Sequence, residues 1–216
     1  MFKNHSNKNN KGFLISFEGI EGVGKSTQVQ LITEYLTAKK IPCIKTREPG
    51  GTSVGNQIRS CLLSEHDFPL HPETELCLLL GARFDHWNNI VLPALNDNNV
   101  VIIDRFIDAT MAYQGYGRGL DRDQISSMHK SLKLDIEPDL TFLLDMPIEA
   151  SRDRMNTRGF SDRIEKEKND FFDKVRQGYL NLSQLHNRIH QIDASLSKDI
   201  VSNMIIEKTN LLLNIQ

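Results

Sequence analysis

The sequence predicts a three-layer α/β fold in which helices cover both faces of a parallel sheet. Short apolar runs, typical of strands buried on both faces, alternate with longer stretches whose apolar residues recur at helical spacing. The chain opens with a strand, a helix and a second strand, an order that implies parallel pairing and a right-handed crossover. Ligands of such sheets bind at the carboxyl ends of the strands. We therefore look for functional residues directly after each strand.

Five segments are predicted as strands, and two of them, the first and the third, are almost wholly apolar, as expected for strands inside a parallel sheet. The five are Phe13 to Phe17, Pro42 to Thr46, Val100 to Asp104, Leu140 to Asp145 and Ile189 to Ile192. The third ends in an acidic residue, so the sheet would present Asp104 at its carboxyl edge.

Seven segments are predicted as helices from their apolar spacing. They are Lys25 to Lys40, Val54 to Leu63, Pro72 to Trp87, Asp121 to Leu134, one that opens at Pro147, Asp170 to Arg188 and Lys198 to Leu213. Pro72 suits a first helical turn, and Asp121 suits an N-cap. Pro93 is expected to kink or end the helix that begins at Pro72.

Length and composition favour one ordinary domain. With 216 residues the chain can bury a substantial core, and residues 13–216 are predicted to form a single unit behind a polar N-terminal tail, residues 1–12. The formal charge of −2 gives no overall basic field for nucleic acid, and no apolar run is long enough to span a membrane. Cys43, Cys61 and Cys77 share no metal-binding spacing, so we expect reduced core thiols in a cytoplasmic protein.

A glycine-rich loop follows the first strand and matches the phosphate-loop template of Gly, four free positions and Gly-Lys-Ser. The nucleotide-binding candidates are Gly19, Ile20, Glu21, Gly22, Val23, Gly24, Lys25, Ser26 and Thr27. Glycines allow successive backbone N–H groups to turn toward an anion, and the helix that follows adds its own free amides. Lys25 can reach the terminal phosphates, and the Ser26 hydroxyl can hold Mg²⁺. The alternative is a glycine turn before an ordinary helix.

Charged residues suited to a second anionic ligand follow the other strands or lie on nearby helices. They are Arg47, Glu48, Arg83, Asp104, Arg105, Arg152, Arg154 and Arg158. A single arginine is more often a surface charge or an ion-pair partner than a ligand. Their position at strand ends beside a phosphate loop favours a phosphorylated acceptor that faces the nucleotide.

With these residues in place, the sequence resembles the thymidylate kinases, P-loop enzymes that transfer a phosphoryl group from ATP to dTMP. The resemblance rests on FEGIEGVGKST, on TREPGGT, on Arg83, on residues 104–120 and on residues 152–165, in the family's order and spacing. It implies the P-loop nucleoside monophosphate kinase fold, ATP and dTMP as substrates, Mg²⁺ as cofactor, and a homodimer.

The resemblance also assigns acceptor-binding roles. Arg47 and Arg105 would bind the acceptor phosphate, and Glu21 would face the sugar 3′-hydroxyl. Tyr113 would crowd the 2′ position against ribonucleotides. Three further residues would read the base edge: Arg83, Thr110 and Gln114.

Catalysis of phosphoryl transfer depends on alignment and positive charge, because the transition state spreads negative charge over the equatorial oxygens. The expected catalytic residues are Lys25, Asp104, Arg105, Arg154 and Arg158, with Ser26 and Asp104 at the metal. Arg154 and Arg158 fall in the family's basic lid, here around residues 150–165. Because no arginine occupies the free positions of the phosphate loop, we expect Arg158, with Arg154 second, to act as an arginine finger.

Two positions depart from the family's pattern. Leu79 stands where an aromatic residue usually stacks on the thymine, and Ala109 stands where a serine is frequent. Loss of ring stacking is worth roughly 1 kcal/mol. We expect binding that is weaker but still directed to thymine.

Two other functions remain open from the sequence. A deoxyribonucleoside kinase or another nucleoside monophosphate kinase would share the fold, and Glu18 or Glu48 would then be the candidate base for a nucleoside hydroxyl. A nucleotide-dependent switch or sensor needs the phosphate loop and a magnesium acid, but it does not need a second set of arginines.

Overall fold

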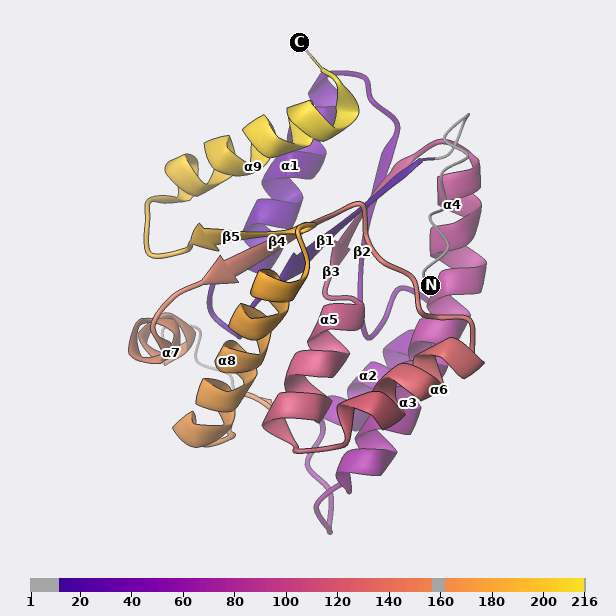
Figure 1. Ribbon diagram of the computed structural model, residues 1–216, viewed down its shortest axis with the longest axis vertical. Coiled ribbons are helices and arrows are strands. Elements are labelled where there is room, and N and C mark those ends of the chain that lie inside the picture. Colours follow the sequence, from indigo (N-terminus) through magenta and orange to yellow (C-terminus); the bar gives the residue numbers. More distant parts are fainter. Residues whose placement is uncertain (1–11, 157–161, 216) are drawn as a thin grey trace.

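The computed structural model describes residues 12–156 and 162–215, and its centre is a parallel sheet of five strands. The strands are β1 (Phe13–Glu18), β2 (Cys43–Arg47), β3 (Val100–Asp104), β4 (Leu140–Asp145) and β5 (Ile189–Asp193). Their order across the sheet is β2-β3-β1-β4-β5, so β1 is central (Figure 1). The predicted α/β class with a five-stranded parallel sheet is confirmed.

Helices follow the strands in the expected alternation. They are α1 (Lys25–Ala38), α2 (Ser53–Leu63), α3 (Pro72–His86), α4 (Leu92–Asn96), α5 (Ile107–Thr110), α6 (Arg122–Ser131), α7 (Ile148–Asn156), α8 (Asn169–Leu185) and α9 (Lys198–Leu213). Two π-helical segments, η1 (Trp87–Val91) and η2 (Met111–Gly117), extend α3 and α5. None of the helices in the described ranges is long and apolar enough to cross a bilayer.

Alternate residues of the central strand face opposite layers of the fold. Leu14 packs with Val101 and with Val91 of η1, whereas Ile15 belongs to the cluster that includes Ile32 of α1. Figure 1 shows α1 and α9 together on one side of the sheet. Because both faces are covered, β1 and β3 are apolar along almost their whole length.

Strand register brings the predicted phosphate-binding side chains to one edge of the sheet. Asp104 at the end of β3 is paired with Arg47 of β2 on one side and with Phe17 of β1 on the other. The phosphate loop leaves β1 at this edge. All strands run parallel, but β2 and β3 lie on one side of β1 and β4 and β5 on the other, and open α/β sheets form a ligand crevice where the strand order changes in this way.

Of the two outcomes expected at Pro93, a kink or the end of the helix, the structure excludes the second. The helical path does not end at Pro93, because η1 and α4 carry it on to Asn96. The wider π turn of η1 changes the backbone hydrogen-bonding pattern just before the proline, and Pro93 then lies in the first turn of α4, where a missing N–H costs little.

Three other details were wrong or missed. The helix predicted to reach Arg188 ends at Leu185, because the Arg188 carbonyl already accepts a bond from the Thr141 amide of β4. The helical segment α5–η2 was not predicted. The cysteines are not core thiols: Cys43 is half-buried, and Cys61 and Cys77 are exposed.

Candidate active site

The phosphate loop is shaped by glycines at positions that other residues would strain. Gly19, Gly22 and Gly24 have φ angles of 133°, 76° and 95°, in the region that favours glycine. A Cβ on Gly19 would lie 2.3 Å from the Leu144 carbonyl oxygen, and one on Gly22 would lie 2.5 Å from that of Ser151. The loop is thus fitted closely against β4 and α7.

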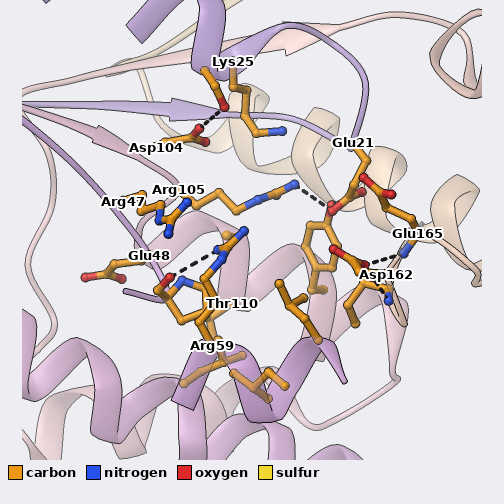
Figure 2. Close-up of a pocket in the computed structure, with 18 of the residues that line it drawn as sticks. Glu21, Lys25, Arg47, Glu48, Arg59, Asp104, Arg105, Thr110, Asp162 and Glu165 are labelled. Atoms are coloured by element: carbon orange, nitrogen blue, oxygen red, sulfur yellow. Dashed lines mark hydrogen bonds and ion pairs between the residues drawn. The ribbon is translucent and has the colours of Figure 1, made fainter. Parts of the chain in front are cut away.

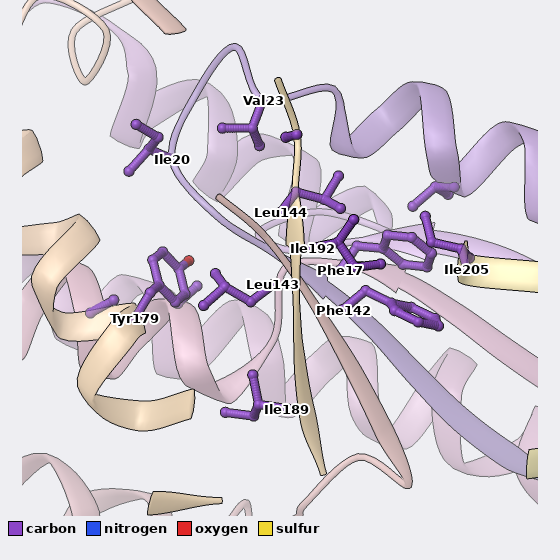
Figure 3. Packing of buried hydrophobic residues seen from close by; sticks show 14 of the residues in the cluster. Phe17, Ile20, Val23, Phe142, Leu143, Leu144, Tyr179, Ile189, Ile192 and Ile205 are labelled. Atoms are coloured by element: carbon purple, nitrogen blue, oxygen red, sulfur yellow. The ribbon is translucent and has the colours of Figure 1, made fainter. Parts of the chain in front are cut away.

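Two apolar loop residues anchor this turn from behind. Ile20 and Val23 are each 3% exposed and pack into the main core (Figure 3). Their buried side chains leave only backbone groups for the nucleotide-binding role that the loop motif predicts. Gly22, Gly24 and Thr27 line the cavity in front of the loop.

Lys25 is the first residue of α1, and its ammonium group bends back over the loop. The Lys25 Nζ atom donates to the carbonyl oxygens of Gly19 at 3.0 Å and Ile20 at 2.7 Å. Burial, followed by the nearby positive charge of Arg105, lowers the pKa of Lys25 to about 8. A polyphosphate in front of the loop would oppose both causes and favour the charged form.

Ser26 and Asp104 form the oxygen pair expected of a magnesium site. The Ser26 hydroxyl donates to Asp104 Oδ2 at 2.7 Å across the mouth of the loop. Within the described ranges, no group of three or more His, Cys, Asp or Glu side chains could hold a metal by itself. A hydroxyl and one carboxylate suit Mg²⁺, which is commonly bound by few protein ligands together with substrate phosphates and water.

Arg105 lies between the loop and the second half of the same cavity (Figure 2). Its Nη2 donates to Glu21 Oε1 at 2.8 Å, and its Nη1 donates to the Gly19 carbonyl at 3.0 Å. The guanidinium also lies 4.8 Å from the centre of the Tyr113 ring, and the Tyr113 hydroxyl donates to Glu21 Oε2 at 2.6 Å. Arg47, at the end of β2, is exposed and lines the same cavity.

Arg83 is held in place by four groups. Its Nε donates to Glu48 Oε2 at 2.5 Å and its Nη2 to the Phe106 carbonyl at 2.9 Å, while Nη1 bonds to Thr110 Oγ1 at 2.9 Å and to His129 Nε2 at 2.7 Å. These contacts leave one guanidinium N–H, on Nη2, without a partner in the described part of the chain. Arg83 thus connects several elements through hydrogen bonds and also lines the cavity.

Two buried partners fix the charge state around Arg83. Burial alone would raise the pKa of Glu48, but Arg83 and His86 hold it below its ordinary value. Burial and the adjacent Arg83 lower the pKa of His129 to about 4. The His129 ring is therefore neutral near pH 7, with Nδ1 donating to the Ile125 carbonyl at 2.9 Å and Nε2 accepting from Arg83.

The side chains predicted to contact the base gather at the far end of the cavity. Thr110 and Gln114 line it together with Leu79 and Ala109. Gln114 is 4% exposed, and its Oε1 atom has no hydrogen-bond partner among the described residues. A buried acceptor without a partner costs free energy, so this atom is suited to receive a donor from a ligand.

Comparison with known proteins decides the family. The family model described as thymidylate kinase matches residues 17–205. The chain belongs to the thymidylate kinase family. It is 45% identical to the thymidylate kinase of Ruthia magnifica over 196 residues, which cover 90% of this chain and 96% of that protein. It is also 45% identical to the Acinetobacter baylyi thymidylate kinase over 195 residues, 89% of this chain and 96% of that protein.

A solved structure gives the same result for the fold. The crystal structure of thymidylate kinase from Ehrlichia chaffeensis matches with a TM-score of 0.74 and 30% identity, covering 92% of this chain and 99% of that one. The chain therefore has the P-loop nucleoside monophosphate kinase fold and is a kinase, a phosphotransferase.

Several charged residues of the thymidylate kinase site were missed by the sequence analysis. Arg59 of α2 lines the cavity, and its Nη1 donates to the Pro49 carbonyl at 3.2 Å. Arg163 and Glu75 line it too, and Arg163 Nη2 lies 3.2 Å from Glu75 Oε1. One weak signal for Arg59 was present in the sequence. Arg59 lies on the helix that begins directly after the REPGG loop, where Thr52 is the N-cap.

The two lid arginines differ in what the structure describes. Arg154 is exposed on α7. It is not among the described residues that line the cavity. Arg158 lies outside the described residues, so its proposed catalytic role stays a prediction. Residues 162–165, directly after the residues that are not described, do line the cavity.

Proposed function

We propose that this kinase transfers the γ-phosphoryl group of ATP to dTMP, giving dTDP and ADP for dTTP synthesis. The acceptor follows from the thymidylate kinase family to which the chain belongs. The observation that carries the proposal is the single cavity with a phosphate loop at one end and arginines at the other, lined by Lys25, Ser26 and Asp104 near the loop and by Arg47, Arg59 and Arg105 beyond it.

At the donor end, the backbone of residues 19–27 and the Lys25 ammonium bind the triphosphate. Ser26 and Asp104 would hold Mg²⁺, which would supply positive charge to the phosphates. Lys25 leaves its carbonyl partners for the phosphate oxygens, whose negative charge favours the protonated ammonium form. Lid residues, with Arg158 first and Arg154 second, add charge at the transferred group and exclude water.

At the acceptor end, Arg47 and Arg105 bind the dTMP phosphate, and Arg59 adds a third guanidinium. Charge-assisted bonds of this kind are the strong ones, and they align the attacking oxygen with the γ-phosphorus. Glu21 faces the sugar 3′-hydroxyl, and Tyr113 closes the space next to the 2′ position.

The base lies between Leu79 and the polar group formed by Arg83, Thr110 and Gln114. The unpartnered Gln114 Oε1 accepts from the N3–H group of thymine, and the remaining Arg83 N–H donates to a base carbonyl. The first contact supplies a donor to Gln114 Oε1, and the second supplies an acceptor to the Arg83 Nη2 N–H group. Neither of these two groups has a partner among the described residues. Cytosine lacks the N3–H donor and is a poorer match.

Two carboxyl groups weigh against a nucleoside as acceptor. Glu18 is buried behind the loop and is absent from the lining of the described cavity. Glu48 lines the cavity but is held ionised by Arg83 and His86, with a lowered pKa that makes it a weak base. The surplus of guanidinium groups favours an acceptor that already carries a phosphate.

A coupled assay of ADP release tests the proposal. Turnover is expected to be fastest with ATP and dTMP, slower with dUMP and slowest with dCMP. It is expected to be negligible with thymidine or without an acceptor. Equal rates with dTMP, dUMP and dCMP would contradict the base contacts. ADP release that no acceptor stimulates would instead support a nucleotide switch.

We further propose a cytoplasmic homodimer built on one domain, residues 13–216. The α2–α3 face supports the dimer, because Val54 is 49% exposed and Phe84 of α3 is 47% exposed. Sedimentation of the full chain tests it: a Phe84→Glu variant is expected to sediment as a monomer. Unchanged sedimentation would place the interface elsewhere.

A further inference from the structure

A buried carboxyl group lies directly behind Arg105 and has no part in the site described above. Glu18 is the last residue of β1 and is fully buried. Its Oε1 accepts from the Phe106 backbone N–H at 2.7 Å, and its Oε2 accepts from the Tyr179 hydroxyl at 2.8 Å. Figure 3 shows Tyr179 reaching from α8 toward this end of the sheet.

Both contacts lead to Arg105. Phe106 is its chain neighbour, and the Tyr179 hydroxyl accepts a bond from Arg105 Nη1 at 3.2 Å. The Arg105 amide itself donates to the Phe17 carbonyl at 2.9 Å. Two consecutive residues of β1, Phe17 and Glu18, therefore bind the backbone amides of Arg105 and of the residue after it. The Arg105 guanidinium is bound by the Tyr179 hydroxyl, which Glu18 orients.

Arg105 needs this support because its backbone is strained. Its φ angle is 70°, in the left-handed region that a non-glycine residue rarely adopts. Such a conformation persists only where surrounding contacts fix it. Without them, the chain after β3 would relax and carry the guanidinium away from Glu21 and the cavity.

We propose that Glu18 is a positioning residue that holds Arg105 in its acceptor-binding orientation. The proposal rests on the role of Arg105 given under Proposed function. Glu18 does not line the described cavity, so its effect on the acceptor passes through Phe106 and Tyr179. The two bonds require two acceptor atoms at the end of a side chain of this length, which only Glu supplies, whereas Gln supplies one.

A double-mutant cycle on dTMP binding tests the proposal, with dissociation constants from calorimetry on the full chain without ATP. Glu18→Met keeps the length of the side chain and removes both acceptors. It is expected to weaken dTMP binding about five- to tenfold, in line with the loss of hydrogen bonds, and to leave ATP binding within about twofold. Glu18→Gln, which keeps one acceptor, is expected to restore most of the affinity.

The cycle is completed in an Arg105→Ala background. There the same Glu18→Met change is expected to alter dTMP affinity less than about twofold, because the group it positions is gone. An effect of equal size in both backgrounds, or no effect in either, overturns the proposal. Unchanged dTMP binding in Arg105→Ala alone would instead overturn the role of Arg105, which separates the two failures.

Tyr179→Phe provides a second route if Glu18→Met does not fold. It removes only the hydroxyl between Glu18 and Arg105 and leaves the buried ring, so it is expected to weaken dTMP binding about two- to fivefold, again only where Arg105 is present. Glu34→Gln, at an exposed site on α1, is the matched control and is expected to change neither ligand's affinity. A Tyr179→Phe effect that persists without Arg105 overturns the proposal.

Discussion

The two ends of the cavity, which we propose bind the phosphate donor and the acceptor, are built in different ways. The donor end comes almost entirely from one continuous stretch, residues 19–27, whose glycines set the backbone and whose Lys25 and Ser26 follow at once. The acceptor end draws its side chains from several separate segments, among them the end of β2, α2, α3, the turn after β3, and α5–η2. The geometry of the donor end is therefore set locally, while that of the acceptor end depends on how helices pack. Substitutions at the donor end are expected to change catalysis, and substitutions at the acceptor end are expected to change dTMP binding.

The largest expected effect concerns the lid over the donor. Arg158→Ala is expected to lower kcat by about 10³- to 10⁵-fold, because an arginine finger stabilises charge only in the transition state, and to change the KM for dTMP far less. Steady-state kinetics with ATP and dTMP checks it. Arg122→Ala, where the arginine lies over the Tyr116 ring, is the control and should retain activity. Unchanged turnover in Arg158→Ala would remove this residue from the mechanism.

Lys25→Met tests the phosphate loop itself. Loss of the ammonium group is expected to lower kcat by about 10²- to 10³-fold, the size found when a preorganised donor to the transition state is removed. The affinity for dTMP, measured without ATP, should stay within about twofold, because Lys25 lies at the other end of the cavity. Lys208→Met on exposed α9 is the control. A large loss of dTMP affinity in Lys25→Met would show that the two ends are not separable.

The same contrast explains how much the sequence could predict. The five strands, the layer arrangement and the phosphate loop were predicted from local patterns, because a phosphate loop needs its glycines and lysine at fixed spacing. The order of the strands across the sheet was not predicted. Arg59 and Glu75 were missed because their place in the site depends on the packing of α2 against α3 and on the segment at residues 162–165. No local pattern in the sequence encodes that packing.

The missed segment α5–η2 is a second example. It contains two glycines, Gly115 and Gly117, which argue against a helix, yet packing requires the second of them. A Cβ on Gly117 would lie 2.7 Å from the Phe171 ring of α8, so the close approach of the two helices selects glycine. Tertiary contact here overrides helix propensity, and it brings Tyr113 and Gln114 into the acceptor end.

Arg105→Ala tests the acceptor end directly. Charge-assisted hydrogen bonds are worth about 1.5–3 kcal/mol, so dTMP affinity is expected to fall about 10- to 100-fold while ATP affinity changes little. Arg59→Ala, which removes a guanidinium further along the same cavity, is expected to give a smaller loss in the same direction. Equal losses of ATP and dTMP affinity in Arg105→Ala would mean that this arginine, bonded to the Gly19 carbonyl, supports the loop instead.

The smallest expected effect lies at the base itself, where we expect Leu79 to stand in place of the family's aromatic residue. Leu79 is half-buried on α3 and lines the cavity. Leu79→Phe restores an aromatic face for stacking, worth roughly 1 kcal/mol, so the KM for dTMP is expected to fall about fivefold with kcat unchanged. Leu211→Phe, at an exposed site on α9, is the control. A higher KM in Leu79→Phe would mean that the space between Leu79 and Gln114 already fits the base and that leucine is the better partner here.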